Sequence, residues 1–244
     1  MVSGQQRSVF DLQFCVPSEC ARRVENGAAD LGIVPVAEIE RQALQVVPGT
    51  GIACRGAVRS ILLVSKGDPR RIRTLAADSG SRTSVRLARI VLQERYGAQP
   101  STFEQAPSLE TMLAGADAAL LIGDAALHVD PETLPYPCLD LGAEWLALTG
   151  LPMVFALWAG RPAQVQRWNP DALAQDFSAS LDAGMAALDE IVAAESAARG
   201  LDPSLVREYL TRHIVFRIGR LERDGLDAFN RLSAMLRSET VPSL

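Results

Sequence analysis

Short apolar runs alternate along the chain with longer stretches of helical spacing. The runs at residues 31–36, 73–77 and 118–123 are too short for ordinary helices and indicate buried strands. Residues 83–96 instead carry apolar side chains at every third or fourth position, which predicts an amphipathic helix. Because strands and helices follow one another in turn, the pattern predicts an α/β protein.

Two stretches of the chain, residues 10–36 and 101–127, resemble each other. Each is expected to run from a strand through Pro-Ser into a short helix that ends at a glycine, and then into a second strand. Strand, helix and strand in that order predict a parallel βαβ unit, so the likeness favours two α/β lobes of related topology. The alternative is that any two βαβ units look alike. The expected helix caps and ends are Ser18 and Gly27 in the first stretch, and Ser108 and Gly115 in the second.

Two segments are expected to lead from one lobe into the other. Residues 46–70 hold two strand-like runs on either side of Gly56. The return is expected at residues 139–160, where Asp140 can cap a helix, Gly150 can end it, and a buried strand follows. The predicted domains are a first lobe from residues 1–66 together with 152–244, and a second lobe from residues 67–151.

The remainder of the chain is predicted to be helical, with its apolar stripes facing the core rather than a partner. Gly219 and Gly225 are expected to mark breaks between these helices. The stripes are Leu173, Phe177, Leu181, Leu188 and Val192, followed by Phe229, Leu232 and Leu236.

Charge and length narrow the function classes. The 244 residues carry a formal net charge of −5, which disfavours a nucleic acid or an anionic membrane as partner. The longest apolar run falls far short of the roughly 20 residues that a membrane-spanning helix needs. Since the N-terminus has no apolar stretch typical of an export signal, a soluble cytoplasmic protein is expected.

The thiols and imidazoles of the chain do not form a metal-binding pattern. No two cysteines have CxxC spacing, so they are expected to be buried thiols. Both histidines are isolated from any metal-ligand spacing, and no zinc site is expected. The residues concerned are Cys15, Cys20, Cys54 and Cys138, with His128 and His213.

Polar side chains gather where the strand at 73–77 gives way to the helix at 83–96. The amides of a helix N-terminus lack intrahelical partners and attract anions. Hydroxyls add donors, Gly80 allows close approach of the backbone, and Arg82 can fork onto a carboxylate. A single capping hydroxyl is the structural alternative, but four hydroxyls with an arginine exceed what a cap requires. The expected anion site comprises Ser79, Ser81, Arg82, Thr83 and Ser84, and no P-loop pattern points to a nucleoside triphosphate.

Two further turns are expected to face the same cleft between the lobes. Gly123 and Asp124 follow the strand at 118–122, and Asp124 can either accept a ligand hydroxyl or cap the next short helix. The corresponding turn of the first lobe contains Pro35 and is apolar, so it would give shape more than chemistry.

Five segments of the chain share residues and order with one known family. They are GIVPVAEI, IACRGAVRSILLVSK, ADSGSRTSVRLARIVLQERYG, ADAALLIGDAAL and DLGAEWLALTGLPMVFALWA, and YLTRHIVFRIGRLERDGLDAF also fits. The chain thereby resembles the chorismate dehydratases of the futalosine route to menaquinone. The resemblance implies a two-lobed type 2 periplasmic-binding-protein-like fold with C-terminal helices. It also implies dehydration of chorismate to 3-[(1-carboxyvinyl)oxy]benzoate without a metal or organic cofactor, and a carboxylate-binding role for the 79–84 loop.

One departure from the family concerns the start of the chain. The family begins with a strand and a Ser-Tyr/Phe-Leu-Asn-Thr loop, and no such motif precedes Phe10. The first of the two similar stretches likewise has no counterpart of residues 73–100. We therefore hypothesise a late-starting reading frame, which a longer upstream reading frame would support.

Two alternatives to the dehydratase stay open. One is a cytosolic protein of the same fold that binds or senses a small aromatic acid, and the other is the dihydroxynaphthoate synthase of the same pathway. The Gly-Ser-Arg-Thr-Ser run favours the dehydratase. The sequence assigns no catalytic residue, and it leaves the oligomeric state open, with a homodimer as one option.

Overall fold

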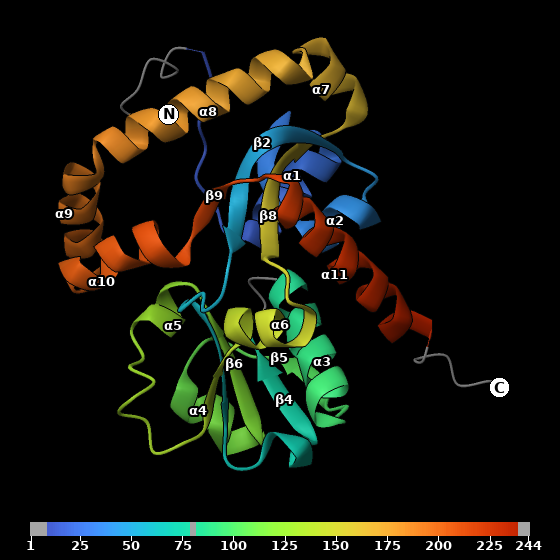
Figure 1. The fold of residues 1–244 in the computed structure, drawn as a ribbon, viewed down its shortest axis with the longest axis vertical. Coiled ribbons are helices and arrows are strands. Elements are labelled where there is room, and N and C mark those ends of the chain that lie inside the picture. The colour runs from blue at the N-terminus through green and yellow to red at the C-terminus, as the bar shows by residue number, and fades with distance from the viewer. Residues whose placement is uncertain (1–8, 79–81, 239–244) are drawn as a thin grey trace. The chain divides into compact units, whose positions relative to one another are not determined.

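The computed structural model describes residues 9–78 and 82–238 and divides the chain into two compact units. Unit 1 comprises Met1–Ala53 and Phe155–Gly219, and unit 2 comprises Cys54–Val154 and Arg220–Leu244. The chain therefore passes between the units three times. Each unit is built around its own β-sheet (Figure 1).

These boundaries differ from those expected from the sequence. Strand β3 (Ile61–Ser65) was expected in the first lobe, yet it pairs along its whole length with β6 (Ala118–Ile122) and so lies in unit 2. Helix α11 (Arg220–Ser238) also belongs to unit 2, where it packs against α3 (Arg82–Tyr96). Pairing between strands distant in sequence sets the division.

The sheet of unit 1 has four strands in the order β1-β8-β2-β9. Its outer pairs are antiparallel: β1 (Leu31–Pro35) runs against β8 (Met153–Gly160), and β2 (Gln45–Cys54) against β9 (Val215–Arg217). The buried strand expected around residues 153–159 is confirmed as β8.

The first of the two similar stretches is not a βαβ unit. The strand expected at residues 10–16 is wrong: these residues form no strand, and most of them are exposed. Because β1 lies at the edge of its sheet, no parallel neighbour precedes it among the described residues. The expected related topology of the two stretches therefore stops at a helix followed by a strand.

Helices surround the sheet of unit 1. Helix α8 covers one part of the core through Phe177, whose ring stacks on Trp158 with centroids 4.3 Å apart. The apolar stripe expected from Leu173 to Val192 is interrupted at Ala187, where α8 ends and α9 begins. The helices of unit 1 are α1 (Pro17–Asn26), α2 (Val36–Arg41), α7 (Pro162–Arg167), α8 (Pro170–Ala186), α9 (Leu188–Arg199) and α10 (Pro203–Glu208), with a π-helical turn η3 (Tyr209–His213).

The sheet of unit 2 has five strands in the order β5-β4-β6-β3-β7. Strand β4 (Thr74–Ala77) runs parallel to both β5 (Ser101–Glu104) and β6, as the second similar stretch predicts. Strand β3 is antiparallel to β6 and to β7 (Cys138–Asp140). The central strands β3, β4 and β6 are almost wholly buried, which explains their continuous apolar sequences.

Helices cover both faces of this sheet (Figure 1). Side chains such as Leu62, Ala76 and Leu121 point to the face where α4 (Leu109–Gly115) contributes Met112 and Leu113. Helices α3 and α6 (Leu141–Thr149) pack together and lie against the sheet on the opposite side from α4. A short helix α5 (Asp124–Leu127) and a 3-10 turn η2 (Pro69–Arg71) complete the unit.

The helix ends show which local signals hold. Asp140 caps α6 with its carboxylate, and Gly27 and Gly150 end α1 and α6 in the left-handed conformation, as predicted. Ser18 does not cap α1, because the helix already begins at Pro17, a residue favoured in the first helical turn. Ser108 occupies the N-cap position of α4 but makes no capping hydrogen bond through its side chain.

The break expected at Gly225 is wrong, since this glycine lies inside α11. A Cβ atom added there would lie 2.0 Å from the carbonyl oxygen of Pro152. Glycine is thus needed for close packing of α11 on the neighbouring backbone. The ring of Phe229, one helical turn further on, then packs edge-on against Trp145 with centroids 6.1 Å apart.

We predict that Gly225→Ala lowers the free energy of unfolding by about 2–3 kcal/mol, since backbone must shift to admit the methyl group. Gly184→Ala in α8 is the matched control, because a Cβ there meets no atom closer than 4.0 Å. That substitution should stabilise by about 0.5–1 kcal/mol through helix propensity. Urea unfolding followed by circular dichroism measures both, and equal effects of the two substitutions would contradict the packing account.

Candidate functional site

The described residues on either side of the predicted anion-binding loop are Asp78, after β4, and Arg82, at the start of α3. Strands β4 and β6 are parallel neighbours, with Ala77 aligned to Leu120. The backbone N–H of Asp78, just beyond β4, donates to the carbonyl of Leu120 at 3.3 Å. The two strands therefore end side by side, and α/β sheets commonly bind ligands at the carboxyl ends of their strands.

The start of α3 presents its three described site residues differently. The side chain of Arg82 is exposed, whereas Thr83 and Ser84 are 0% and 1% exposed. Of these three residues, Arg82 is therefore the one that a ligand can reach. Thr83 and Ser84 are buried in the first turn of α3. Ser79, Gly80 and Ser81 lie outside the described residues.

Gly123 and Asp124 follow β6 at the same edge. Gly123 has φ 62° and ψ −135°, a conformation that glycine tolerates far better than other residues, and it occupies the N-cap position of α5. Its N–H donates to the carbonyl of Ser60 at 2.8 Å. Asp124 is exposed and is the first residue of α5, so the expectation that it caps this helix is wrong.

The sequence predicts only a capping role for Asp140, and the structure shows that its carboxylate also binds the backbone before β3. Its carboxylate accepts the capping N–H groups of Gly142 and Ala143 at 2.9 and 3.1 Å. It also accepts the N–H groups of Val58 and Arg59 at 2.9 and 2.6 Å. Asp140 thus ties the turn before β3 to the N-terminus of α6.

Arg59 is a second residue that the sequence did not single out. Its guanidinium donates to the carbonyls of Ala126, Leu127 and Val129, with N–O distances of 2.9, 3.3 and 2.6 Å. Its backbone has φ 64°, in the left-handed region. Since α5 begins at Asp124, these bonds fix the short helix that carries Asp124.

Pro35, the remaining predicted site residue, ends β1 in unit 1 and is buried. The turn continues directly into α2, whose first residues Val36 and Ala37 are also buried. The turn is therefore apolar, as predicted.

Two residues of the motif DLGAEWLALTGLP turn out to have packing roles. Glu144 accepts hydrogen bonds from Arg95 at 2.6 Å and from the Tyr96 hydroxyl at 2.8 Å, and so joins α6 to α3. Burial and the Glu144 carboxylate raise the pKa of Tyr96. Trp145 is fully buried and donates its indole N–H to the carbonyl of Pro152 at 3.0 Å.

The cysteines differ in exposure more than predicted. Cys54 is buried, Cys20 and Cys138 are half-buried, and Cys15 is exposed, which corrects the expectation for Cys15. Burial is the largest cause that raises the pKa of Cys54 to about 12 and that of Cys138 to about 11. Within the described part of the chain, no group of three or more Cys, His, Asp or Glu side chains is arranged to hold a metal ion.

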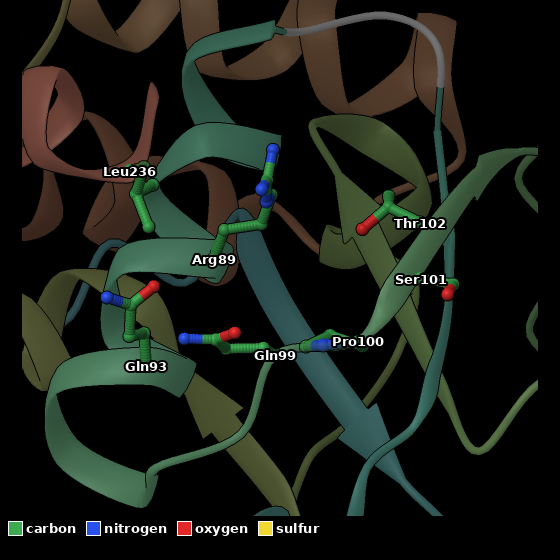
Figure 2. Close-up of a pocket in the computed structure, with 7 residues that line it drawn as sticks. All are labelled: Arg89, Gln93, Gln99, Pro100, Ser101, Thr102 and Leu236. Atoms are coloured by element: carbon green, nitrogen blue, oxygen red, sulfur yellow. The ribbon is translucent and has the colours of Figure 1, made fainter. Parts of the chain in front are cut away.

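A hollow of about 350 Å³ lies elsewhere in unit 2 (Figure 2). It is formed between α3, the start of β5 and the end of α11, and none of the predicted site residues lines it. Because it adjoins the amino end of β5, it lies away from the carboxyl edge that carries Arg82 and Asp124. Its lining residues are Arg89, Gln93, Gln99, Pro100, Ser101, Thr102 and Leu236.

Comparisons with solved structures define the class of fold. The aliphatic sulphonate binding protein SsuA of Escherichia coli superimposes with a TM-score of 0.63 at 14% identity, over 95% of this chain and 78% of that one. SsuA of Xanthomonas axonopodis pv. citri gives 0.63 at 17% identity, over 95% and 83%. The expected periplasmic-binding-protein-like fold is confirmed. No helix among residues 9–78 and 82–238 has the length and apolarity to cross a membrane.

Sequence comparison then identifies the family. The family model described as menaquinone biosynthesis matches residues 4–235, and the chain belongs to that family. The chorismate dehydratase of Thermus thermophilus is 30% identical over 237 residues, covering 90% of this chain and 85% of that enzyme. The resemblance to the chorismate dehydratases is thereby confirmed.

The bonds of Arg59 give a prediction for the carboxyl edge. Arg59→Ala removes three hydrogen bonds to backbone carbonyls and should lower the free energy of unfolding by about 2 kcal/mol. Arg59→Gly loses the same bonds but relieves the left-handed backbone, so it should be less destabilising than Arg59→Ala by about 1 kcal/mol. Thermal and urea unfolding measure both, with the exposed Arg70→Ala as control.

Equal effects of alanine and glycine at position 59 would show that its backbone is not strained. A negligible effect of both would contradict the role of the guanidinium in holding α5.

Proposed function

We propose that this protein is a chorismate dehydratase, a carbon–oxygen lyase that acts in menaquinone biosynthesis. The observation that carries the proposal is the 30% identity to the Thermus thermophilus enzyme across 90% of the chain. The family match over residues 4–235 supports the same pathway. A biosynthetic role of this kind is consistent with a cytoplasmic location.

The proposed reaction requires few reactive groups on the protein. Chorismate carries two carboxylates and a ring hydroxyl. Loss of that hydroxyl and of one ring proton as water makes the ring aromatic and gives 3-[(1-carboxyvinyl)oxy]benzoate, so the driving force resides in the substrate. The protein must hold the dianion in place and stabilise the departing hydroxyl, and positioning with fixed dipoles can supply much of the acceleration.

The carboxyl edge of the unit 2 sheet is the proposed place for one substrate carboxylate. Arg82 is exposed there and can fork onto a carboxylate, and the amides at the start of the 15-residue helix α3 favour negative charge. Thr83 and Ser84 are buried in the first turn of α3, and Ser79 and Ser81 stay predicted ligands on sequence grounds. Asp124 is proposed to accept a hydroxyl of the substrate from the neighbouring turn.

Pro35 is proposed to contribute shape rather than a polar contact. The apolar turn that it begins suits the ring of chorismate better than its carboxylates. Because the turn has no hydrogen-bonding side chain at its first three residues, any discrimination it makes is by size.

The fold also suits a binding protein that does no chemistry, since the sulphonate-binding proteins share it. Turnover separates these functions. We expect incubation with chorismate to yield an aromatic product lighter than chorismate by one water, detected by ultraviolet absorbance and mass spectrometry. Saturable binding of chorismate without turnover would favour the sensor, and conversion of a cyclic futalosine derivative instead would favour the dihydroxynaphthoate synthase.

The proposed carboxylate contact predicts the behaviour of Arg82→Ala. Loss of a charge-assisted hydrogen bond should raise KM for chorismate by about 10- to 100-fold. The melting temperature should stay nearly unchanged, because the side chain is exposed. Steady-state kinetics and calorimetry measure the two effects.

Arg89→Ala is the matched control on the same helix, since Arg89 lies two turns further along, beside the hollow of Figure 2. It should change KM by less than about threefold. If Arg82→Ala instead lowers the melting temperature and leaves KM unchanged, Arg82 supports the fold and does not bind the substrate.

A further inference from the structure

Cys15 and Cys20 lie on either side of the first turn of α1. The helix begins at Pro17 with Val16 as its N-cap, so Cys15 precedes the cap and Cys20 is the fourth helical residue. Side chains at these two positions characteristically pack together, an arrangement in which apolar residues staple the entering chain to the helix. In this protein both positions of the staple are occupied by thiols.

The surrounding contacts fix the chain on both sides of Cys15. The N–H of Cys20 donates to the carbonyl of Val16 at 3.0 Å, which fixes the first turn. One turn further on, Arg23 donates to the side-chain oxygen of Gln13 at 2.5 Å and to Glu19 at 2.7 Å. Residue 13 and residue 16 are thus both attached to the same helix, and Cys15 lies between them.

The residues that surround Cys20 restrict where its sulfur can lie. A Cβ atom added at Gly32 would fall 2.5 Å from the Cys20 sulfur, so β1 leaves room for that sulfur only because residue 32 is glycine. Cys20 also packs against the apolar cluster of Ala21, Val24, Val34 and Ala159. Burial is the largest cause that raises the pKa of the Cys20 thiol to about 11, and the nearby Cys15 thiol acts in the same direction.

We propose that Cys15 and Cys20 form a peroxide-sensitive dithiol that closes into a disulfide across the first turn of α1. Cys15 is exposed and is the thiol that an oxidant reaches first, whereas half-buried Cys20 is placed to resolve the product. Hydrogen peroxide oxidises the Cys15 sulfur to a sulfenic acid and releases water. Attack of the Cys20 sulfur on that sulfur forms the S–S bond and releases a second water, so two thiols and one hydrogen peroxide give one disulfide and two waters.

Trypsin provides a direct assay, because cleavage after Arg7 and Arg22 places both cysteines in one peptide, residues 8–22, that contains neither Cys54 nor Cys138. The folded protein is treated with hydrogen peroxide, quenched, denatured, alkylated and digested. Before oxidation the peptide should carry two alkyl groups. Afterwards it should carry none and weigh two hydrogens less, and dithiothreitol should restore both alkylation sites.

Closure should be roughly tenfold faster than any loss of alkylation at Cys54, which is buried. Cys20→Ser should abolish closure and leave Cys15 to oxidise further to a sulfinic acid or to link two chains. Cys138→Ser is the matched control, since it removes a half-buried thiol of unit 2 and should leave closure unchanged.

Three results would overturn the proposal. In the first, the peptide of residues 8–22 stays fully alkylated after oxidation. In the second, wild-type Cys15 accumulates as sulfinic acid although Cys20 is present. In the third, the disulfide that forms joins separate chains. None of these readouts depends on chorismate, so failure here is distinguishable from failure of the proposed reaction.

Discussion

A single carboxylate, that of Asp140, organises the carboxyl edge of the unit 2 sheet. It accepts four backbone N–H groups, two from the turn before β3 and two from the first turn of α6. Three of these N–H groups donate to Oδ1 and one donates to Oδ2, so both carboxylate oxygens take part. The chain that enters unit 2 at residue 54 is thereby fixed to a helix that follows it by more than 80 residues.

The effect of Asp140 extends to the proposed site through neighbouring backbone. Once the amide of Arg59 is held, its side chain reaches the carbonyls at the end of α5, and the carbonyl of Ser60 accepts the N–H of Gly123. Helix α5, which begins at Asp124, is therefore held at its N-terminal end through Gly123 and at its C-terminal end through Arg59. Functional groups on such a supported turn keep their positions without a ligand, which lowers the cost of binding one.

Sequence signals predict correctly those features that depend on residues close together in the chain. Asp140 as an N-cap, Gly27 and Gly150 as helix ends, and the strands β4 and β6 around the expected anion loop all follow from residues near each other in sequence. The errors arise where distant segments meet. A glycine inside a helical pattern predicts a break, and the reason for Gly225, the carbonyl of Pro152, lies some 70 residues away in the sequence. The left-handed backbone at Arg59 cannot be predicted locally, because the residue is not a glycine.

The motif residues that carry the family resemblance differ in their burial and contacts. Glu144 and Trp145 bind Arg95, Tyr96 and the carbonyl of Pro152, so their presence indicates the fold of unit 2 rather than a reaction. Arg82 differs from them because its side chain is exposed at the first residue of α3, so it does not pack in the core. The motif residues shared with the family are largely packing residues, which explains why the fold could be predicted from the sequence. The proposed chemistry depends instead on the few exposed polar groups at this edge.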